Sequence, residues 1–196
     1  RLLLMNTNYS LANHMKGPDA FITLLKKGGK ISTPEEESFA REWAEHKKKL
    51  FNAFLELVPV LSRQFPDYAV VVRPHPSENH ETYRKAFMPY PGVHVRHEGN
   101  VIPWLLASDV LIHNGCTTGV EAALLDRNVL AYCPYRSEQY DIHFPNEISV
   151  QCDTSEDVIS EIRRMTKSES SQYNRESLQH YLHDIDGNGA RKVVKA

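Results

Sequence analysis

Two short polar motifs carry side chains suited to holding a phosphate group. Residues 73–76 (Arg-Pro-His-Pro) follow the apolar run 70–72. Arg73 is permanently charged and can donate a fork of hydrogen bonds to phosphate oxygens, and a protonated His75 can bind a phosphate or give it a proton. The prolines stiffen the loop and carry no N–H, so they fix the direction of these two side chains. The motif predicts a cation and an imidazole that act on one anion.

The second motif, residues 114–119 (Asn-Gly-Cys-Thr-Thr-Gly), follows the predicted strand 109–113 and joins it to a predicted helix. Glycine lets the backbone approach a ligand closely, threonine adds hydroxyl donors, and a helix start offers free N–H groups and a partial positive charge. Glu121, one turn into that helix, is predicted to accept hydrogen bonds from ribose hydroxyls, as acidic residues do in nucleotide-binding folds. The phosphate contacts predicted from this motif are Asn114, Gly115, Thr117 and Thr118.

Three further asparagines are candidates for the same site. Asn100 precedes a short predicted helix, and Asn6 and Asn8 follow the first predicted strand. All of these features also have a purely structural interpretation. Residues 73–76 can form a rigid turn with a surface arginine, the threonines can cap a helix, and Glu121 can interact with the helix dipole. The residue patterns alone leave both interpretations open.

Alternating strand and helix signals indicate how these motifs are positioned. Strands are predicted at 2–7, 68–73, 93–96, 109–113, 128–132 and 148–151, and helices at 34–63, 79–87, 100–106, 117–126 and from 155 onward. Several strands are apolar on consecutive residues, which is typical of a parallel sheet covered on both faces. We therefore predict an α/β fold, a Rossmann-like parallel sheet with helices on both faces. Both motifs then lie at the carboxyl edge of the sheet, where such folds bind ligands.

Two predicted helices begin with capping-box patterns. Thr33 and Glu36 mark the start of the longest helix, and Thr154 with Asp157 marks another. Pro59 is expected to kink the long helix. The two remaining long segments, 8–31 and 133–147, are predicted to be loops, and 8–31 can also contain a short helix.

The composition is that of an ordinary globular chain. Its 196 residues are 41% hydrophobic and 24% charged, and the formal net charge of -2 gives no overall field that favours nucleic acid. Three cysteines without a C-x-x-C pair argue against a disulfide framework. The lysine run 47–49 is interpreted as a solvated helix face. No spacing matches a zinc site, and no apolar run approaches the roughly 18–20 residues that span a bilayer.

Residues 70–76 and 99–132 together resemble the C-terminal half of a GT-B glycosyltransferase. They are similar to bacterial surface-carbohydrate biosynthesis proteins and to the HP-motif transferases that release CMP, namely sialyltransferases, Kdo transferases and teichoic-acid glycerophosphotransferases. In those families a His-Pro motif and a Ser/Thr pair at a helix start hold the nucleotide phosphate. Residues 73–76 match the first, and Thr117 with Thr118 match the second. Glu121 falls where GT-B enzymes commonly place a ribose-binding acid.

The resemblance implies a glycosyltransferase of bacterial surface polysaccharide synthesis. Its donor would be a nucleotide-activated sugar, with a CMP-linked sugar of the Kdo or sialic-acid kind first and a UDP-linked sugar second. Arg73 and His75 would be the catalytic groups, stabilising the leaving phosphate as negative charge develops. No metal or other cofactor is expected. Two alternatives stay open: a non-hydrolysing UDP-sugar 2-epimerase, and a non-catalytic GT-B-like module that binds a glycan or a partner.

We expect a single nucleotide-sugar-binding domain over residues 1–196, with residues 168–196 as a helical tail. The chain starts without Met inside a predicted strand, so we expect a fragment of a longer two-domain protein. In GT-B enzymes the N-terminal domain binds the acceptor, here a glycan or glycolipid, and usually supplies the general base, so activity is expected to need that domain. The expected location is cytoplasmic, including the inner face of the cell membrane, with at most peripheral membrane contact and no nucleic-acid partner.

Overall fold

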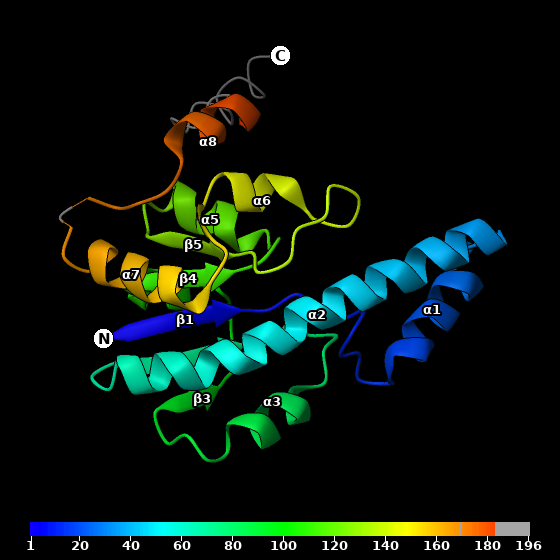
Figure 1. Ribbon diagram of the computed structural model, residues 1–196, viewed down its shortest axis with the longest axis horizontal. Helices are drawn as coiled ribbons and strands as arrows, with labels where there is room; N and C mark the ends of the chain where they lie inside the picture. Colours follow the sequence, from blue (N-terminus) through cyan, green and yellow to red (C-terminus); the bar gives the residue numbers. More distant parts are fainter. Residues whose placement is uncertain (169, 183–196) are drawn as a thin grey trace.

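The computed structural model describes residues 1–168 and 170–182, and this part of the chain forms three layers (Figure 1). A six-stranded sheet lies in the middle, and helices cover both of its faces. Every pair of neighbouring strands is parallel, and the strand order is β3-β2-β1-β4-β5-β6. The predicted α/β fold with a Rossmann-like parallel sheet is confirmed.

The strands are short and consist mainly of apolar residues. Their bounds are β1 Leu2–Asn6, β2 Ala69–Arg73, β3 Val93–Val95, β4 Val110–His113, β5 Val129–Tyr132 and β6 Val150–Cys152. The four inner strands are buried on consecutive residues, which is why unbroken apolar runs predicted them correctly. The register pairs Asn6 with Arg73 and Met5 with Ile112, so β1, β2 and β4 end side by side at the carboxyl edge.

The helices form a separate layer on each face of the sheet. Their bounds are α1 Pro18–Lys27, α2 Pro34–Gln64, α3 His80–Phe87, α4 Ile102–Ala107, α5 Thr118–Leu124, α6 His143–Glu147, α7 Ser155–Met165 and α8 Arg175–Tyr181. One apolar cluster joins α2, α3 and α7 to the sheet, and a second joins α4, α5 and α8 to its other face. Leu3 and Met5 belong to the first cluster and Leu4 to the second, as the alternation of side chains along a strand requires.

The long helix α2 reaches well past the carboxyl edge of the sheet (Figure 1). Its start has the predicted capping box, because Thr33 Oγ1 accepts from Glu36 N at 3.2 Å and the Glu36 carboxylate accepts from Thr33 N at 3.1 Å. The helix continues through Pro59. Its projecting end packs against α1 through a small cluster that includes Ile22 and Ala40. This pair of helices forms a wall beside the edge where the motifs lie.

The interpretation of the lysine run 47–49 as a solvated face is wrong for one of its residues. Lys48 and Lys49 are exposed, but Lys47 is only 2% exposed. At 3.6 residues per turn, Lys47 shares a face with Phe51 and Phe54, which belong to the core. The helical period therefore outweighs the charge of the residue in fixing where Lys47 lies.

Two other segments differ in detail from the prediction. The segment 133–147, predicted as a loop, contains the short helix α6, and its five residues are too few for a helical period to show in the sequence. In the predicted tail 168–196, α8 is helical, while residue 169 and residues 183–196 lie outside the described part.

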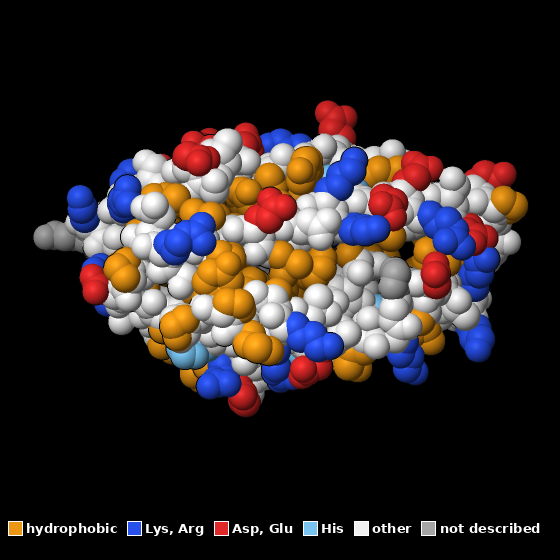
Figure 2. Space-filling model, turned by 60° about the horizontal axis from the view of Figure 1, so that its bottom comes forward, with side chains coloured by type: hydrophobic (Ala, Val, Ile, Leu, Met, Phe, Trp, Pro, Cys, Tyr) orange, Lys and Arg blue, Asp and Glu red, His pale blue; other side chains and the backbone are white. Residues whose placement is uncertain are grey.

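Charged side chains of both signs are mixed over the surface that Figure 2 shows. Lys and Arg lie among Asp and Glu there, and apolar side chains are visible near the middle of this face. Such mixing agrees with the formal net charge of -2. None of the helices in the described ranges is both long and apolar enough to cross a membrane.

Candidate phosphate-binding site

A cavity of about 170 Å³ lies at the carboxyl edge of the sheet, beside the point where the strand order reverses between β1 and β4. This is the topological switch point at which open α/β sheets bind ligands. The volume is below the roughly 300 Å³ of a small-molecule pocket, so the cavity suits a phosphate-sized group rather than a whole nucleotide. Both sequence motifs and the end of β1 contribute to its lining: Asn6, Thr7, Arg73, Pro74, His75, Pro76, His97, Val101, Cys116 and Thr118.

Arg73 is the last residue of β2, and its side chain is buried. Its Nη1 donates to the carbonyl of Glu98 at 3.0 Å, and its Nη2 donates to the carbonyl of Gly99 at 2.6 Å. These bonds use two of the five N–H donors and hold the loop after β3 against the cavity. Burial lowers the pKa of Arg73, yet a guanidinium remains charged at neutral pH. Arg73 therefore places a fixed positive charge in the cavity wall.

The ring of His75 is oriented by Ser77. The Ser77 N–H donates to Nδ1 at 3.3 Å, and Ser77 Oγ lies 2.7 Å from the same nitrogen. A backbone N–H can only donate, so Nδ1 is an acceptor and the neutral ring carries its proton on Nε2. His75 is exposed and lines the cavity. Its Nε2–H is therefore the donor available to an anion.

A buried carboxylate that the sequence did not reveal holds the loop of His75 in place. Glu78 is fully buried, and its Oε1 accepts from Thr7 Oγ1 at 2.8 Å and from His75 N at 3.0 Å. Its Oε2 accepts from the hydroxyl of Tyr83. A buried charge requires such donors, and here they tie the end of β1, the loop after β2 and α3 together. In the sequence Glu78 looks like any acidic residue in a polar loop.

The turn from β4 into α5 is built around the buried imidazole of His113. Its Nδ1 accepts from Cys116 N at 3.3 Å, and its Nε2 lies 2.8 Å from the hydroxyl of Ser149. That hydroxyl donates to the carbonyl of Pro145 at 2.7 Å, so the ring is the donor to Ser149. Burial lowers the pKa of His113 to about 3, which keeps it neutral. A Cβ on Gly119 would overlap this ring, which explains the glycine that ends the second motif.

Asn114 and Gly115 shape this turn and do not line the cavity, although the sequence predicted both as phosphate contacts. The buried amide of Asn114 donates to the carbonyl of Tyr132 at 2.9 Å and so ties β4 to the end of β5. Gly115 has a φ of 57°, in the left-handed region that favours glycine. Its N–H donates to Asn146 Oδ1 at 2.7 Å.

The structure separates the two predicted threonines. Thr118 is half-buried and lines the cavity, and its hydroxyl lies 3.1 Å from the sulfur of Cys116. Thr117 is exposed, forms no side-chain cap on α5 and lies outside the lining. Glu121 lies one turn into α5 and is also outside the lining.

The three predicted asparagines have different surroundings. Asn100 is exposed and its Oδ1 accepts from Ile102 N at 2.8 Å, although the N-cap position of α4 is Val101, one residue later. Asn8 donates to the carbonyl of Gly115 across a long 3.5 Å. Asn6 lines the cavity, and its Oδ1 is buried without a partner within the described residues. An unsatisfied buried acceptor costs about 1–3 kcal/mol, and an ionised phosphate, which only accepts hydrogen bonds, does not satisfy this oxygen.

Six residues of the cavity wall were not predicted as contacts, and two of them, His97 and Cys116, carry titratable side chains. Nδ1 of His97 lies 2.8 Å from the carbonyl oxygen of Pro74 and donates a hydrogen bond to it. Burial lowers the pKa of His97, which favours the neutral ring. Burial raises the pKa of the Cys116 thiol, so the cavity meets a protonated sulfur there. The fixed positive charge of the wall therefore comes from Arg73.

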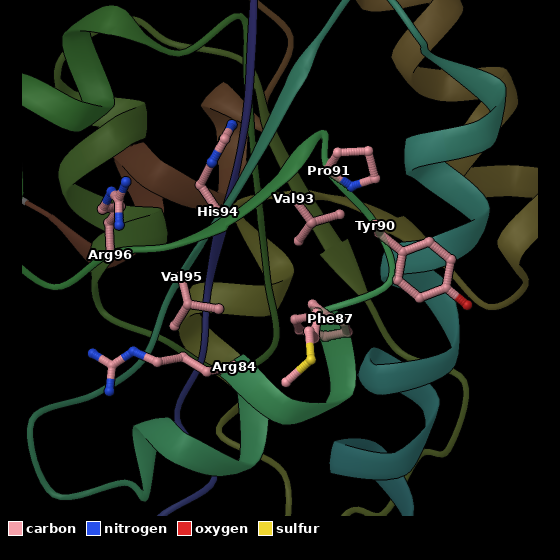
Figure 3. A pocket seen from close by; sticks show the side chains of 9 residues that line it. Arg84, Phe87, Tyr90, Pro91, Val93, His94, Val95 and Arg96 are labelled. Carbon is pink, nitrogen blue, oxygen red and sulfur yellow. The ribbon is translucent and has the colours of Figure 1, made fainter.

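A separate cavity of about 250 Å³ lies between α3 and the edge strand β3 (Figure 3). Arg84 and Arg96 lie on one side of it and Tyr90 on the other, and no residue predicted for the site lines it. Across residues 1–168 and 170–182, no three His, Cys, Asp or Glu side chains are close enough to hold a metal ion.

Comparison with models of known protein families finds no match, and comparison with curated proteins finds no relative. Any functional interpretation of this chain therefore depends on the geometry of the cavity and on the two motifs that line it. Four of the predicted residues lie together in that lining: Asn6, Arg73, His75 and Thr118.

Proposed function

We propose that this chain binds the donor nucleotide of a GT-B-type glycosyltransferase that acts in bacterial surface polysaccharide synthesis. The observation that carries the proposal is that both motifs line one phosphate-sized cavity at the switch point of a Rossmann-like sheet. The resemblance of these motifs to HP-motif transferases favours a CMP-linked sugar as the donor. Arg73, His75 and Thr118 contribute a charge, an imidazole and a hydroxyl to the same cavity.

The proposed chemistry is electrostatic stabilisation of the leaving nucleotide. The bond between the sugar and the phosphate oxygen breaks, a bond to an acceptor hydroxyl forms, and the proton of that hydroxyl passes to a base that we propose lies outside this chain. Negative charge grows on the phosphate as the sugar departs. Donors already fixed around the cavity stabilise this state more than the ground state. Because Arg73 and the neutral donors offset this charge, the proposal includes no metal or other cofactor.

The other partners follow from the same proposal. Glu121 would hold the ribose hydroxyls, beyond the phosphate cavity. The acceptor would be a glycan or glycolipid bound by an acceptor domain. We propose a cytoplasmic location that includes the inner face of the cell membrane, with at most peripheral contact with lipid and no role for nucleic acid.

Calorimetric titration with CMP, UMP, CDP and UDP tests nucleotide binding. The adjacent threonines provide a matched pair of variants, since T118V removes a hydroxyl from the cavity and T117V removes an exposed one. A hydrogen bond to a charged phosphate contributes about 1.5–3 kcal/mol, so T118V should weaken CMP binding about 10- to 100-fold, while T117V should change it little. Equal effects of the two variants would contradict the assigned cavity.

Product analysis tests the reaction class in the whole protein. Incubation with a CMP-sugar and a glycan acceptor should release CMP and lengthen the acceptor, and H75A should reduce this release. Conversion of a UDP-sugar into its 2-epimer without an acceptor would replace the transferase proposal with the epimerase alternative. No binding of any nucleotide, even with the acceptor domain present, would favour the non-catalytic module.

A further inference from the structure

A second cavity, of about 240 Å³, adjoins the phosphate cavity at His75, which lines both. Its wall is formed by the loop after β1, α1, α2, the loop after β2 and the residue before α6. The polar side chains of this wall are Asn8, Ser10, Lys47, His75 and Ser77. None of these side chains is acidic, so they bring no negative charge to the cavity.

Lys47 is the unusual member of this wall. It is 2% exposed, and its Nζ has no hydrogen-bond partner within the described residues. Taking an ammonium group out of water costs several kcal/mol unless a partner compensates it. Burial lowers the pKa of Lys47, as expected for an uncompensated charge. The fold therefore keeps a cation at a place where its own residues do not bind it.

The groups that face Lys47 do not neutralise it. Asp141 acts on it from a distance, but the Asp141 carboxylate accepts from Ser137 N at 2.8 Å and lies 2.7 Å from His46 Nε2. No ion pair between Lys47 and an acid forms within the described ranges. The thiols of Cys116 and Cys133 also face it, and burial raises the pKa of both, that of Cys133 to about 12, so both are uncharged at neutral pH.

Two serine hydroxyls also line this cavity. Ser10 Oγ and Ser77 Oγ are 2.5 Å apart, and Ser77 Oγ is 2.7 Å from His75 Nδ1. Because Nδ1 of His75 is an acceptor, the two hydroxyl protons are used within this chain of bonds. The Lys47 ammonium and the Asn8 amide remain as the donors that suit an oxyanion in this small space. The same serines also set the orientation of His75, so an anion bound here would contact the residue that the phosphate cavity uses.

We propose that Lys47 binds a second oxyanion of the nucleotide-sugar donor, beside the phosphate held by Arg73 and His75. The inference rests on the proposed function for the identity of the donor. Two sources supply the same chemistry: the second phosphate of a nucleoside diphosphate, or a carboxylate on the sugar of a CMP-linked donor. A ligand with this second charge supplies the partner that Lys47 lacks, and CMP alone does not.

The test compares K47M with K49M, because Lys49 is an exposed lysine on the same helix. Calorimetry would use CMP, CDP and CMP-N-acetylneuraminic acid with the whole chain. A charge-assisted bond implies that wild type and K49M bind the doubly anionic ligand about 10- to 100-fold more tightly than K47M, while CMP binds all three alike. If wild type binds CDP more tightly than K47M does, the second oxyanion is a phosphate. If it binds CMP-N-acetylneuraminic acid more tightly, the second oxyanion is the carboxylate of the sugar. Equal affinities of K47M and K49M for every ligand overturn the proposal.

Inorganic pyrophosphate separates this inference from the proposed function. It should raise the melting temperature of wild type and K49M but not of K47M, and this result supports the Lys47 site even if no nucleotide binds. Equal shifts in all three proteins, or no shift in any, overturn it. K47M should also melt at or above the temperature of wild type without ligand, because it removes an uncompensated buried charge. A lower melting temperature of K47M would show that the ammonium has a structural partner, and would overturn the inference as well.

Discussion

His113 makes the β4–α5 turn sensitive to acid. Its pKa is lowered to about 3 in the folded chain, against an ordinary value near 6.5, because the ring is fully buried and both nitrogens are bonded to neutral groups. Below pH 6.5 the unfolded chain takes up a proton that the folded chain does not. The free energy of unfolding should therefore fall by about 1.4 kcal/mol per pH unit between pH 6 and pH 4 from this residue alone.

Denaturant titrations at several pH values check this dependence. H113N removes the titrating ring, so its free energy of unfolding should change less steeply over this pH range than that of wild type. H94N is the matched control, since His94 lies on the edge strand β3 and is half-buried. The same slope in wild type and H113N would contradict the prediction, whatever the absolute stability of the variant.

Gly119 should tolerate no side chain. An alanine Cβ at this position would overlap the ring of His113, whose position is fixed by bonds to Cys116 and Ser149. G119A should therefore lower the free energy of unfolding by about 1–3 kcal/mol, as overpacking does. Gly92 is the control, because the nearest atom to an added Cβ there is Ser62 Oγ at 3.5 Å, an ordinary contact. Thermal or denaturant unfolding in which G92A and G119A behave alike would contradict this reasoning.

At the residue scale, the sequence predicted the side chains whose chemistry is explicit. Arg73, His75 and Thr118 were predicted because a charge, an imidazole or a hydroxyl directly after a strand indicates a site, and all three line the cavity. Glu78 and Lys47 were missed because their importance comes from burial. Only the folded chain shows that one carboxylate holds a loop and that one lysine of three faces inward.

Helix capping sets the stability of the elements that flank the site. The start of α2 projects beyond the sheet, so its first turn depends on the capping box more than on the core. T33A should lower the free energy of unfolding by about 1 kcal/mol, and T154A should act similarly at the start of α7. S38A, an exposed change inside α2, should cost less than about 0.5 kcal/mol.

Amide hydrogen exchange locates the effect of these caps. In T33A the amides of the first turn of α2, including Glu36, should exchange faster while amides of β1 are unaffected. Equal exchange rates of these amides in T33A and S38A would show that packing against α1, rather than the capping box, stabilises this end of α2.

At the element scale, the strands were predicted because four of them are buried on both faces, and burial on both faces leaves unbroken apolar runs. α2 and α7 were predicted from capping boxes that the structure confirms. α6 was not predicted, since five residues that include Pro145 show neither a period nor a cap. The burial of Lys47 was not predicted for a different reason. The helical period places Lys47 on the core face of α2, but a run of three lysines is more typical of a solvated face.

At the scale of the whole molecule, a bound nucleotide should stabilise the fold by mass action. CMP at about one hundred times its dissociation constant adds about 2.7 kcal/mol to the free energy of unfolding. For a chain of this length that corresponds to a rise in melting temperature of about 5–10 °C. T117V should show the same rise, and T118V a smaller one at the same CMP concentration. A rise that is the same in both variants would place the nucleotide elsewhere.

β1 lies in the middle of the sheet although it comes before the other five strands in sequence order. Its residues Leu3, Leu4 and Met5 are completely buried between β2 and β4, and β4 begins only at Val110. During translation these three apolar side chains therefore lack their neighbour on the β4 side until the chain has been made as far as Val110. Contacts between such distant segments slow folding, so the newly made chain passes through a period in which chaperones have an apolar segment to bind.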